Sequence, residues 1–149
     1  MKIVSLIVAL LFQAPAPVSK VVVGLINGQQ VVVEDPEFTG FIHGHSFDSV
    51  LFYRHQPVHG VMPTRTIARI DFGEYKKGQP VTLMLTLRNG QTLEVQTERN
   101  HFLMLRGNTE LGTVIIKHPD PLAGPLRLTT NKPDRKDDLT IQYLEFPAS

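Results

Sequence analysis

Apolar residues occupy every second position on both sides of an Asn-Gly pair at residues 89–90. This period of two is typical of a half-buried β-strand, and Asn-Gly between two such runs is one of the strongest hairpin signals in a sequence. The sequence therefore predicts two strands joined by a tight turn. The alternation is carried by Leu83, Leu85, Leu87, Leu93 and Val95.

The apolar pattern also predicts the register of this hairpin. A three-residue loop over 88–90, with its glycine in the left-handed conformation as a bulge, pairs Leu85 with Leu93 and Leu83 with Val95. A two-residue loop would instead place leucine opposite glutamate and mix the two faces. The bulged hairpin is therefore the prediction.

The same pattern occurs earlier in the chain, around an Asn-Gly pair at residues 27–28. The same three-residue loop there pairs Val23 with Val31 and Val21 with Val33. A bulged hairpin is predicted in this place as well.

Further blocks of sequence match in the same order after each hairpin, which indicates an internal repeat. The last match is displaced by a polar stretch, predicted to be a loop inserted over 129–138 of the second copy. No stretch shows sustained helical periodicity, so each copy is predicted to hold about five short strands. The matching blocks are 38–44 with 101–107, 50–52 with 114–116, 57–60 with 121–124, and 66–72 with 140–146.

The order of these elements resembles a known kind of repeat. A strand, an Asn-Gly hairpin, two middle strands and a closing I-x-x-I/L-[DE]-F strand are similar to the small SH3-like or Sm-like β-barrel repeats of uncharacterised exported bacterial proteins. The resemblance implies an all-β fold of two tandem five-stranded units, either two barrels or one fused β-sandwich or barrel. It implies a bacterial envelope setting and no catalytic residue. The expected divisions are a first unit over 20–73, a linker over 74–80 and a second unit over 81–149.

The first 19 residues have the layout of a secretory signal peptide. Met1-Lys2 carries one positive charge, and residues 3–12 form an apolar run of about ten residues, too short to span a bilayer core, which needs roughly twenty. Small residues follow at 14–16, but Pro17 disfavours cleavage directly after them, so cleavage near Ser19 and retention of the segment both stay open. Export to the periplasm or the medium is predicted, with membrane attachment only if the segment is retained.

Charge and composition exclude several classes of function. Fifteen basic and 14 acidic residues give a net charge of +1, which provides no broad attraction to nucleic acid. The chain has no cysteine, which excludes disulfides, thiolate nucleophiles and zinc–sulfur sites.

Catalytic arrangements are also missing from the pattern. The serine, histidine and aspartate within 44–48 are consecutive on one segment, whereas the members of a catalytic triad converge from separate elements. Asp71 and Glu145 occupy matching places on the two closing strands, where alternation turns them away from the core, so each is expected to be solvated or paired with Arg69 or a lysine. The sequence predicts a protein that is not an enzyme and that has no catalytic residue and no cofactor.

Four of the six histidines fall between residues 43 and 59, and they carry the alternative hypothesis of a copper- or zinc-binding protein. Histidines two apart on a strand share a face, as metal ligands on β-structure often do. The second unit has Arg, Asn and Ala at three of the matching positions, so the repeated unit does not itself contain a set of metal ligands. The default interpretation is that these histidines are solvated loop residues. The candidate ligands are His43, His45, His55 and His59.

The function predicted from sequence is a non-enzymatic binding or scaffolding module of the bacterial envelope. An unpaired edge strand, such as the closing strand over 140–146, is the expected route to an envelope partner or to self-association.

Overall fold

The computed structural model describes residues 19–42, 44–76, 78–97, 102–110, 112–117, 128–129 and 140–148. These residues form twelve strands and one short 3-10 turn, and no helix among them is long and apolar enough to cross a membrane. The strands are β1 (Lys20–Leu25), β2 (Gln30–Ile42), β3 (His45–Asp48), β4 (Val50–His55), β5 (Val58–Pro63), β6 (Ile67–Phe72), β7 (Thr82–Leu87), β8 (Thr92–Gln96), β9 (Phe102–Thr109), β10 (Gly112–Lys117), β11 (Leu128–Thr129) and β12 (Ile141–Glu145).

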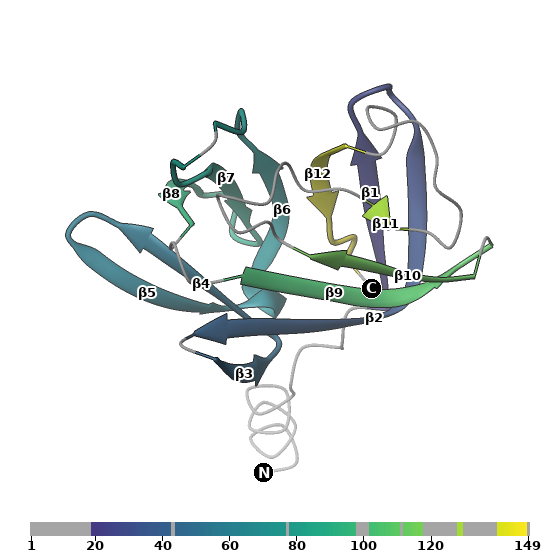
Figure 1. Cartoon of the computed structure of the whole chain (residues 1–149), viewed down its shortest axis with the longest axis horizontal. Helices are drawn as coiled ribbons and strands as arrows, with labels where there is room; N and C mark the ends of the chain where they lie inside the picture. The colour runs from purple at the N-terminus through teal and green to yellow at the C-terminus, as the bar shows by residue number, and fades with distance from the viewer. Residues whose placement is uncertain are drawn as a thin grey trace, which may run out of the picture.

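All described strands belong to one antiparallel sheet with the order β11-β10-β9-β2-β1-β12-β6-β7-β8-β4-β5, and β3 pairs with β2 off this path. The sheet curls into a half-barrel. In the view of Figure 1, β9, β10 and the later part of β2 run across the lower ends of β1, β12 and β6. The all-β prediction is confirmed. Two tandem five-stranded SH3-like units are not confirmed.

Both predicted hairpins have the predicted register. In the first, Val23 faces Val31, and in the second, Leu85 faces Leu93. The glycine of each Asn-Gly pair has a φ of 87°, the left-handed conformation that a bulged loop requires. The hydrogen bonds also match: the asparagine side chain accepts the backbone N–H two residues on, at 2.9 Å, in both turns.

The two closing strands, β6 and β12, lie side by side at the centre of the sheet, and β12 is flanked by β1 on its other edge (Figure 1). Leu144 therefore faces both Val23 and Ile70, and Ile70 faces Leu85 on β7. β6 thus pairs with the hairpin of β7 and β8, and β12 pairs with the hairpin of β1 and β2. The prediction that 140–146 forms a free edge is wrong, because β12 has a neighbour on each side.

The pairing of β6 with β12 at the centre of the sheet is symmetric about one residue pair. Arg69 pairs with Glu145 and Asp71 with Tyr143, while Ile70 pairs with Leu144. Positions 69, 70 and 71 match 143, 144 and 145 in the sequence alignment. The pairing is consequently symmetric about Ile70 and Leu144, in the manner of a local twofold axis.

The concave face of the sheet holds the hydrophobic core. A row of side chains crosses four central strands with exposures of 1% or less, formed by Val23, Leu144, Ile70 and Leu85. Phe146, which follows β12, stacks against Phe38 of β2 with ring centroids 5.1 Å apart. Burial of each such side chain contributes about 1.5–3 kcal/mol to folding.

Three predicted segments lie wholly or partly outside the described residues. They are residues 1–18 of the signal segment, His43 among the candidate ligands, and residues 130–138 of the inserted loop; Thr129 at the start of that loop lies in β11. Residues 74–80 lie in the connection between β6 and β7, which pair with each other.

Candidate partner-binding surface

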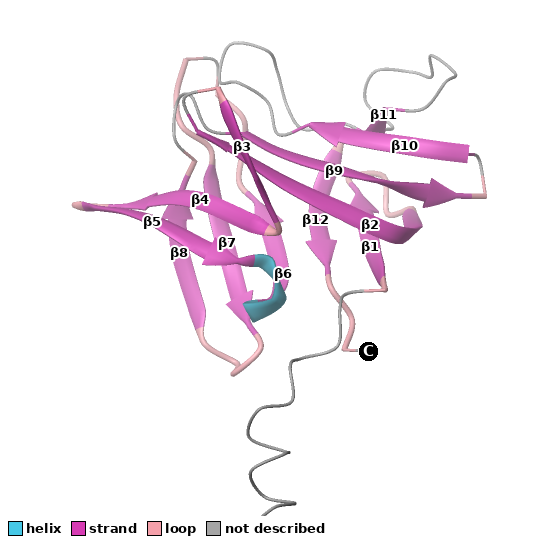
Figure 2. Cartoon of the chain, turned by 90° about the horizontal axis from the view of Figure 1, so that it is seen from below, coloured by secondary structure: helices cyan, strands magenta, loops and turns pink. Residues whose placement is uncertain are grey.

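Strands β4 and β5 form a two-stranded ribbon whose tip lies at the periphery of the molecule (Figures 1 and 2). β4 lies beside β2 and bridges to β8 through one residue pair, Arg54 with Gln96. β5 pairs with β4 along its whole length and ends the strand order, so the described residues place no strand on its far edge. An edge of this kind presents backbone N–H and C=O groups to solvent.

One face of the ribbon packs on the core. Leu51 is buried there, with Tyr53 and Met62 packed against the core cluster. The Tyr53 ring lies over Gly60 of β5, so close that a Cβ added to this glycine would fall 2.2 Å from Cζ of the ring. The packing fixes which face of β5 points outward.

The outward face carries an apolar cluster. Phe52 faces Val61 across the ribbon, and Phe47 of β3 meets the Phe52 ring edge-on at a centroid distance of 5.6 Å and an angle of 72°. Val61 is 56% exposed and Phe47 is 48% exposed. At the tip of the ribbon, Val58 is 54% exposed on the opposite face. Exposed apolar side chains grouped in this way mark interaction sites more often than scattered ones do.

The same outward face is basic beyond the apolar cluster. Arg54 faces His59 on the next residue pair of the same face, and no Asp or Glu occurs between Asp48 and Asp71. Among the described residues the buried Nε of Arg54 has no hydrogen-bond partner. His55 is fixed by a 2.9 Å contact between its Nδ1 and the carbonyl oxygen of Glu94. The ribbon therefore presents positive and neutral polar groups without a carboxylate of its own.

A shallow cavity of about 430 Å³ lies between β8 and the end of β4 at the tip of the ribbon. It lies where the single Arg54–Gln96 bridge leaves the two strands loosely joined. Its walls combine polar side chains with the apolar surface of Val95. The lining residues are Arg54, His55, Gln56, Glu94, Val95 and Gln96.

The candidate metal ligands are distributed over three strands. His45 is exposed on β3, His55 ends β4, and His59 lies on β5, while His43 is outside the described residues. Within the described part of the chain, no three His, Cys, Asp or Glu side chains converge as a metal site would require. The metal-binding alternative stays a prediction.

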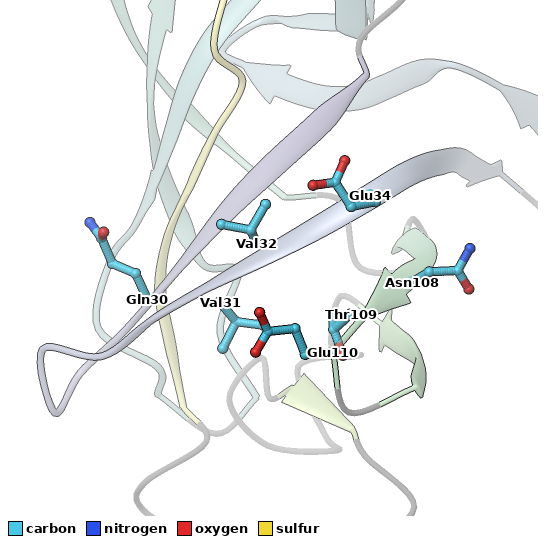
Figure 3. Close-up of a pocket in the computed structure, with 7 residues that line it drawn as sticks. All are labelled: Gln30, Val31, Val32, Glu34, Asn108, Thr109 and Glu110. Carbon is cyan, nitrogen blue, oxygen red and sulfur yellow. The ribbon is translucent and has the colours of Figure 1, made fainter.

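A second cavity, of about 490 Å³, opens beside the first hairpin (Figure 3). Its apolar wall is formed by Val31 and Val32 of β2, and the carboxylates of Glu34 and Glu110 come from two separate elements. None of its described lining residues is basic. The remaining lining residues are Gln30, Asn108 and Thr109.

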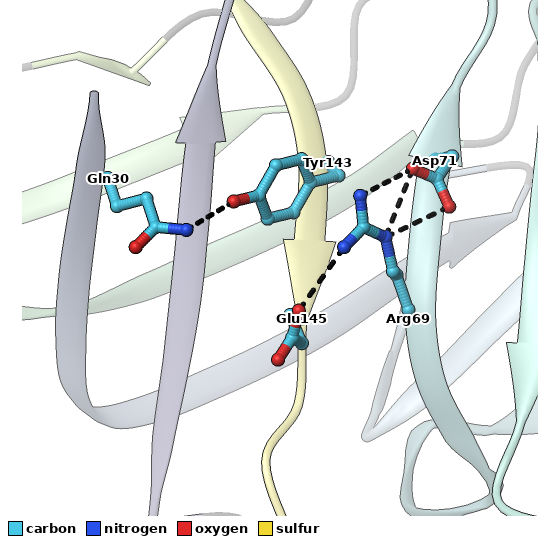
Figure 4. Close-up of polar contacts among 5 residues, drawn as sticks. All are labelled: Gln30, Arg69, Asp71, Tyr143 and Glu145. Atoms are coloured by element: carbon cyan, nitrogen blue, oxygen red, sulfur yellow. Dashed lines mark hydrogen bonds and ion pairs between the residues drawn. The ribbon is translucent and has the colours of Figure 1, made fainter. Parts of the chain in front are cut away.

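The convex face of the central strands carries a polar cluster that crosses from β2 to β6 (Figure 4). The Arg69 guanidinium donates to both carboxylate oxygens of Asp71 at 3.0–3.1 Å and to Glu145 at 3.3 Å. It also lies 3.9 Å above the Tyr143 ring, whose hydroxyl accepts a 2.6 Å hydrogen bond from Gln30. The hydrogen bonds with Asp71 raise the pKa of Arg69 above its ordinary value. Of the alternatives predicted for Asp71 and Glu145, pairing with Arg69 is the one found.

No protein-family model matches this chain, and neither curated proteins nor solved structures include a significant match to it. The surface on β3, β4 and β5 was missed by sequence reasoning, which placed the free edge at 140–146. The signal for it was nevertheless present, as a stretch from 49 to 70 with no acidic residue that includes Val58 and Val61.

Proposed function

We propose that this protein is a non-enzymatic binding module of the bacterial envelope, and that its partner binds the β4–β5 ribbon together with Phe47 of β3. The observation that carries the proposal is strand β5, whose far edge is paired with no described strand, and on which Val58 and Val61, on opposite faces, are each more than half exposed. We call the outward surface formed by Phe47, Phe52 and Val61 the ribbon patch; Val58 is exposed on the other face of the same strand.

The energetic argument for a partner rests on these valines and on the open edge. Full burial of a valine is worth about 1.5–3 kcal/mol relative to exposure, and soluble proteins usually block an open edge with lysine, proline or inward charges. β5 contains no lysine and no carboxylate, and its one proline, Pro63, lies at its end. A partner that covers the ribbon patch and satisfies the free backbone groups would gain both contributions.

Export is part of the same proposal. The charged start, short apolar run and small residues over 1–19 support a signal peptide, and the absence of cysteine is compatible with an envelope location. The periplasm or the medium is accordingly the proposed location of the partner.

The finer description of the fold is also a proposal. Matching turns, matching registers and the symmetric pairing of β6 with β12 support a duplicated five-stranded SH3-like unit whose closing strands are exchanged between copies. A unit of about 60 residues alone buries too little surface to be very stable. A duplication of this kind lets the two units share one core.

Site-specific photo-crosslinking in the producing cell tests the proposed function. A photoreactive residue at Val61 should give a discrete adduct with another protein. The matched control is Ile26, which is 54% exposed in the first hairpin turn and should give none. Absence of adducts at Val61, or the same adducts at both positions, would contradict a partner-binding role for the ribbon patch.

A further inference from the structure

We infer that the partner contributes an extended segment that adds to β5 as a further antiparallel strand, with an apolar residue facing Val61 and an acidic residue facing His59. This inference rests on the proposed function and specifies how the ribbon patch recognises its partner. It begins from β5 itself, which has one paired edge and one open edge among the described residues. Backbone hydrogen bonds along such an edge supply affinity, and alternate side chains supply specificity.

The outward face of the ribbon defines the side chains that fit. Along β5, Val61 and His59 are two residues apart and therefore share a face, with Phe52 and Arg54 directly across on β4. A strand added to β5 continues these two rows. An apolar residue would complete the row of Val61 and Phe52, and a residue two positions along would complete the row of His59 and Arg54.

Charge decides the nature of that second residue. The ribbon has basic residues and no carboxylate of its own, and Glu94 of β8 contacts His55 through its backbone carbonyl. Cross-strand pairs of opposite charge stabilise a sheet, whereas like charges destabilise it. An aspartate or glutamate in the added strand is consequently favoured.

The same charge argument disfavours a second copy of this chain as the occupant. Pairing β5 with β5 of another molecule would bring together two ribbons that each carry Arg54, His55 and His59 and no acidic residue. Complementary potentials favour association, and matching ones oppose it. The partner is therefore a different protein with an alternating apolar and acidic segment.

Fluorescence anisotropy with synthetic peptides and the full chain tests this inference. The probe is a labelled peptide that repeats Val-Thr-Glu-Thr, and its matched control repeats Val-Thr-Lys-Thr. The acidic peptide should bind and weaken with added salt, since exposed charge pairs are screened. The basic peptide should not bind.

Variants of the protein locate the binding. Arg54→Glu and Val61→Lys should each weaken the acidic peptide about tenfold, because the first places a negative charge in the row that receives the acidic residue and the second removes the apolar contact with the added strand. Ile26→Lys, at an equally exposed site, should leave binding unchanged, and circular dichroism confirms that each variant is folded. Two further peptides are N-methylated at every second amide, one at the odd positions and the other at the even positions. Only one of them should lose binding, since only alternate amides of the added strand face β5.

Any of three results with the peptides would overturn the inference: no binding of the acidic peptide, equal binding of both peptides, or insensitivity to Arg54→Glu and Val61→Lys. A dimer of the protein alone, detected by sedimentation and removed by Val61→Lys, would overturn it in favour of self-pairing. If the peptides fail while crosslinking at Val61 persists, strand addition is wrong and the proposed function stands. If both fail, the ribbon patch has no partner.

Discussion

Two tyrosines cover glycines on neighbouring strands, and these contacts set the local packing on both faces of the sheet. A Cβ built on Gly24 would lie 2.0 Å from Cε1 of Tyr143, and the equivalent distance at Gly60 is 2.2 Å from Cζ of Tyr53. Glycine in a strand ordinarily weakens it, and an aromatic side chain laid across it restores the lost packing. These glycines are required for close approach, because neither has a positive φ.

Gly24→Ala should destabilise the protein by about 1–3 kcal/mol, since the added methyl forces the Tyr143 ring off its site and away from Gln30 and Arg69. The free energy of unfolding from urea titration measures the loss. In a Tyr143→Ala background the same change should be neutral or stabilising by about 0.5 kcal/mol, because the clash is gone and alanine is the better strand residue. Additive effects would show that the ring does not lie over Gly24.

At this scale the sequence predicted part of the structure. Alternation along the closing strands predicted that Asp71 and Glu145 point away from the core, with Arg69 as one possible partner. In the structure, Arg69 donates hydrogen bonds to both carboxylates. The alternation could not predict that Tyr143 lies over Gly24, because the two residues are 119 positions apart in the chain and no local pattern connects them.

At the scale of elements, the two Asn-Gly hairpins are the parts of the fold that local sequence determines most fully. Each loop closes with the same backbone bonds, Leu25 N–H to Gln29 and Leu87 N–H to Gln91, at 2.9 and 2.8 Å. The register was predictable because a slip by one residue would expose an entire apolar face. Nothing outside each hairpin is needed to specify it.

Gly28→Ala and Gly90→Ala should each cost about 1 kcal/mol of stability, by a purely conformational effect. Both glycines have a φ of 87°, and nothing lies within 4 Å of a Cβ added to either, so no steric clash contributes. Asparagine tolerates this region better, and Gly90→Asn should therefore lose less than Gly90→Ala. Thermal unfolding of the four proteins, wild type included, measures these differences. A tolerated alanine at both sites would contradict the bulged loops.

The neighbours of the closing strands could not be predicted in the same way. β12 has the same alternation whether it pairs within its own copy or with β1 and β6, so the pattern gives its faces and not its partners. The error in placing a free edge at 140–146 follows from this ambiguity. Pairing between distant strands depends on the whole core, which no local signal encodes.

At the scale of the whole molecule, one sheet order determines both the stability and the proposed function. The pairing of β12 with β1 and β6 makes β12 interior, and the strand order ends at β5, the proposed partner-binding edge. If the two copies folded separately instead, the strand over 140–146 could be an edge and the case for β5 would weaken. The exchange of closing strands is therefore the central claim.

Division of the chain within the connection between β6 and β7, into fragments 19–76 and 77–149, tests the exchange most directly. Each fragment lacks the closing strand that pairs with its own hairpin, so neither should show a cooperative unfolding transition alone. Co-expressed, they should co-purify as a one-to-one complex with the melting behaviour of a single domain. Two fragments that each fold alone as monomers and do not associate would contradict the exchanged sheet, and with it the assignment of β5 as the open edge.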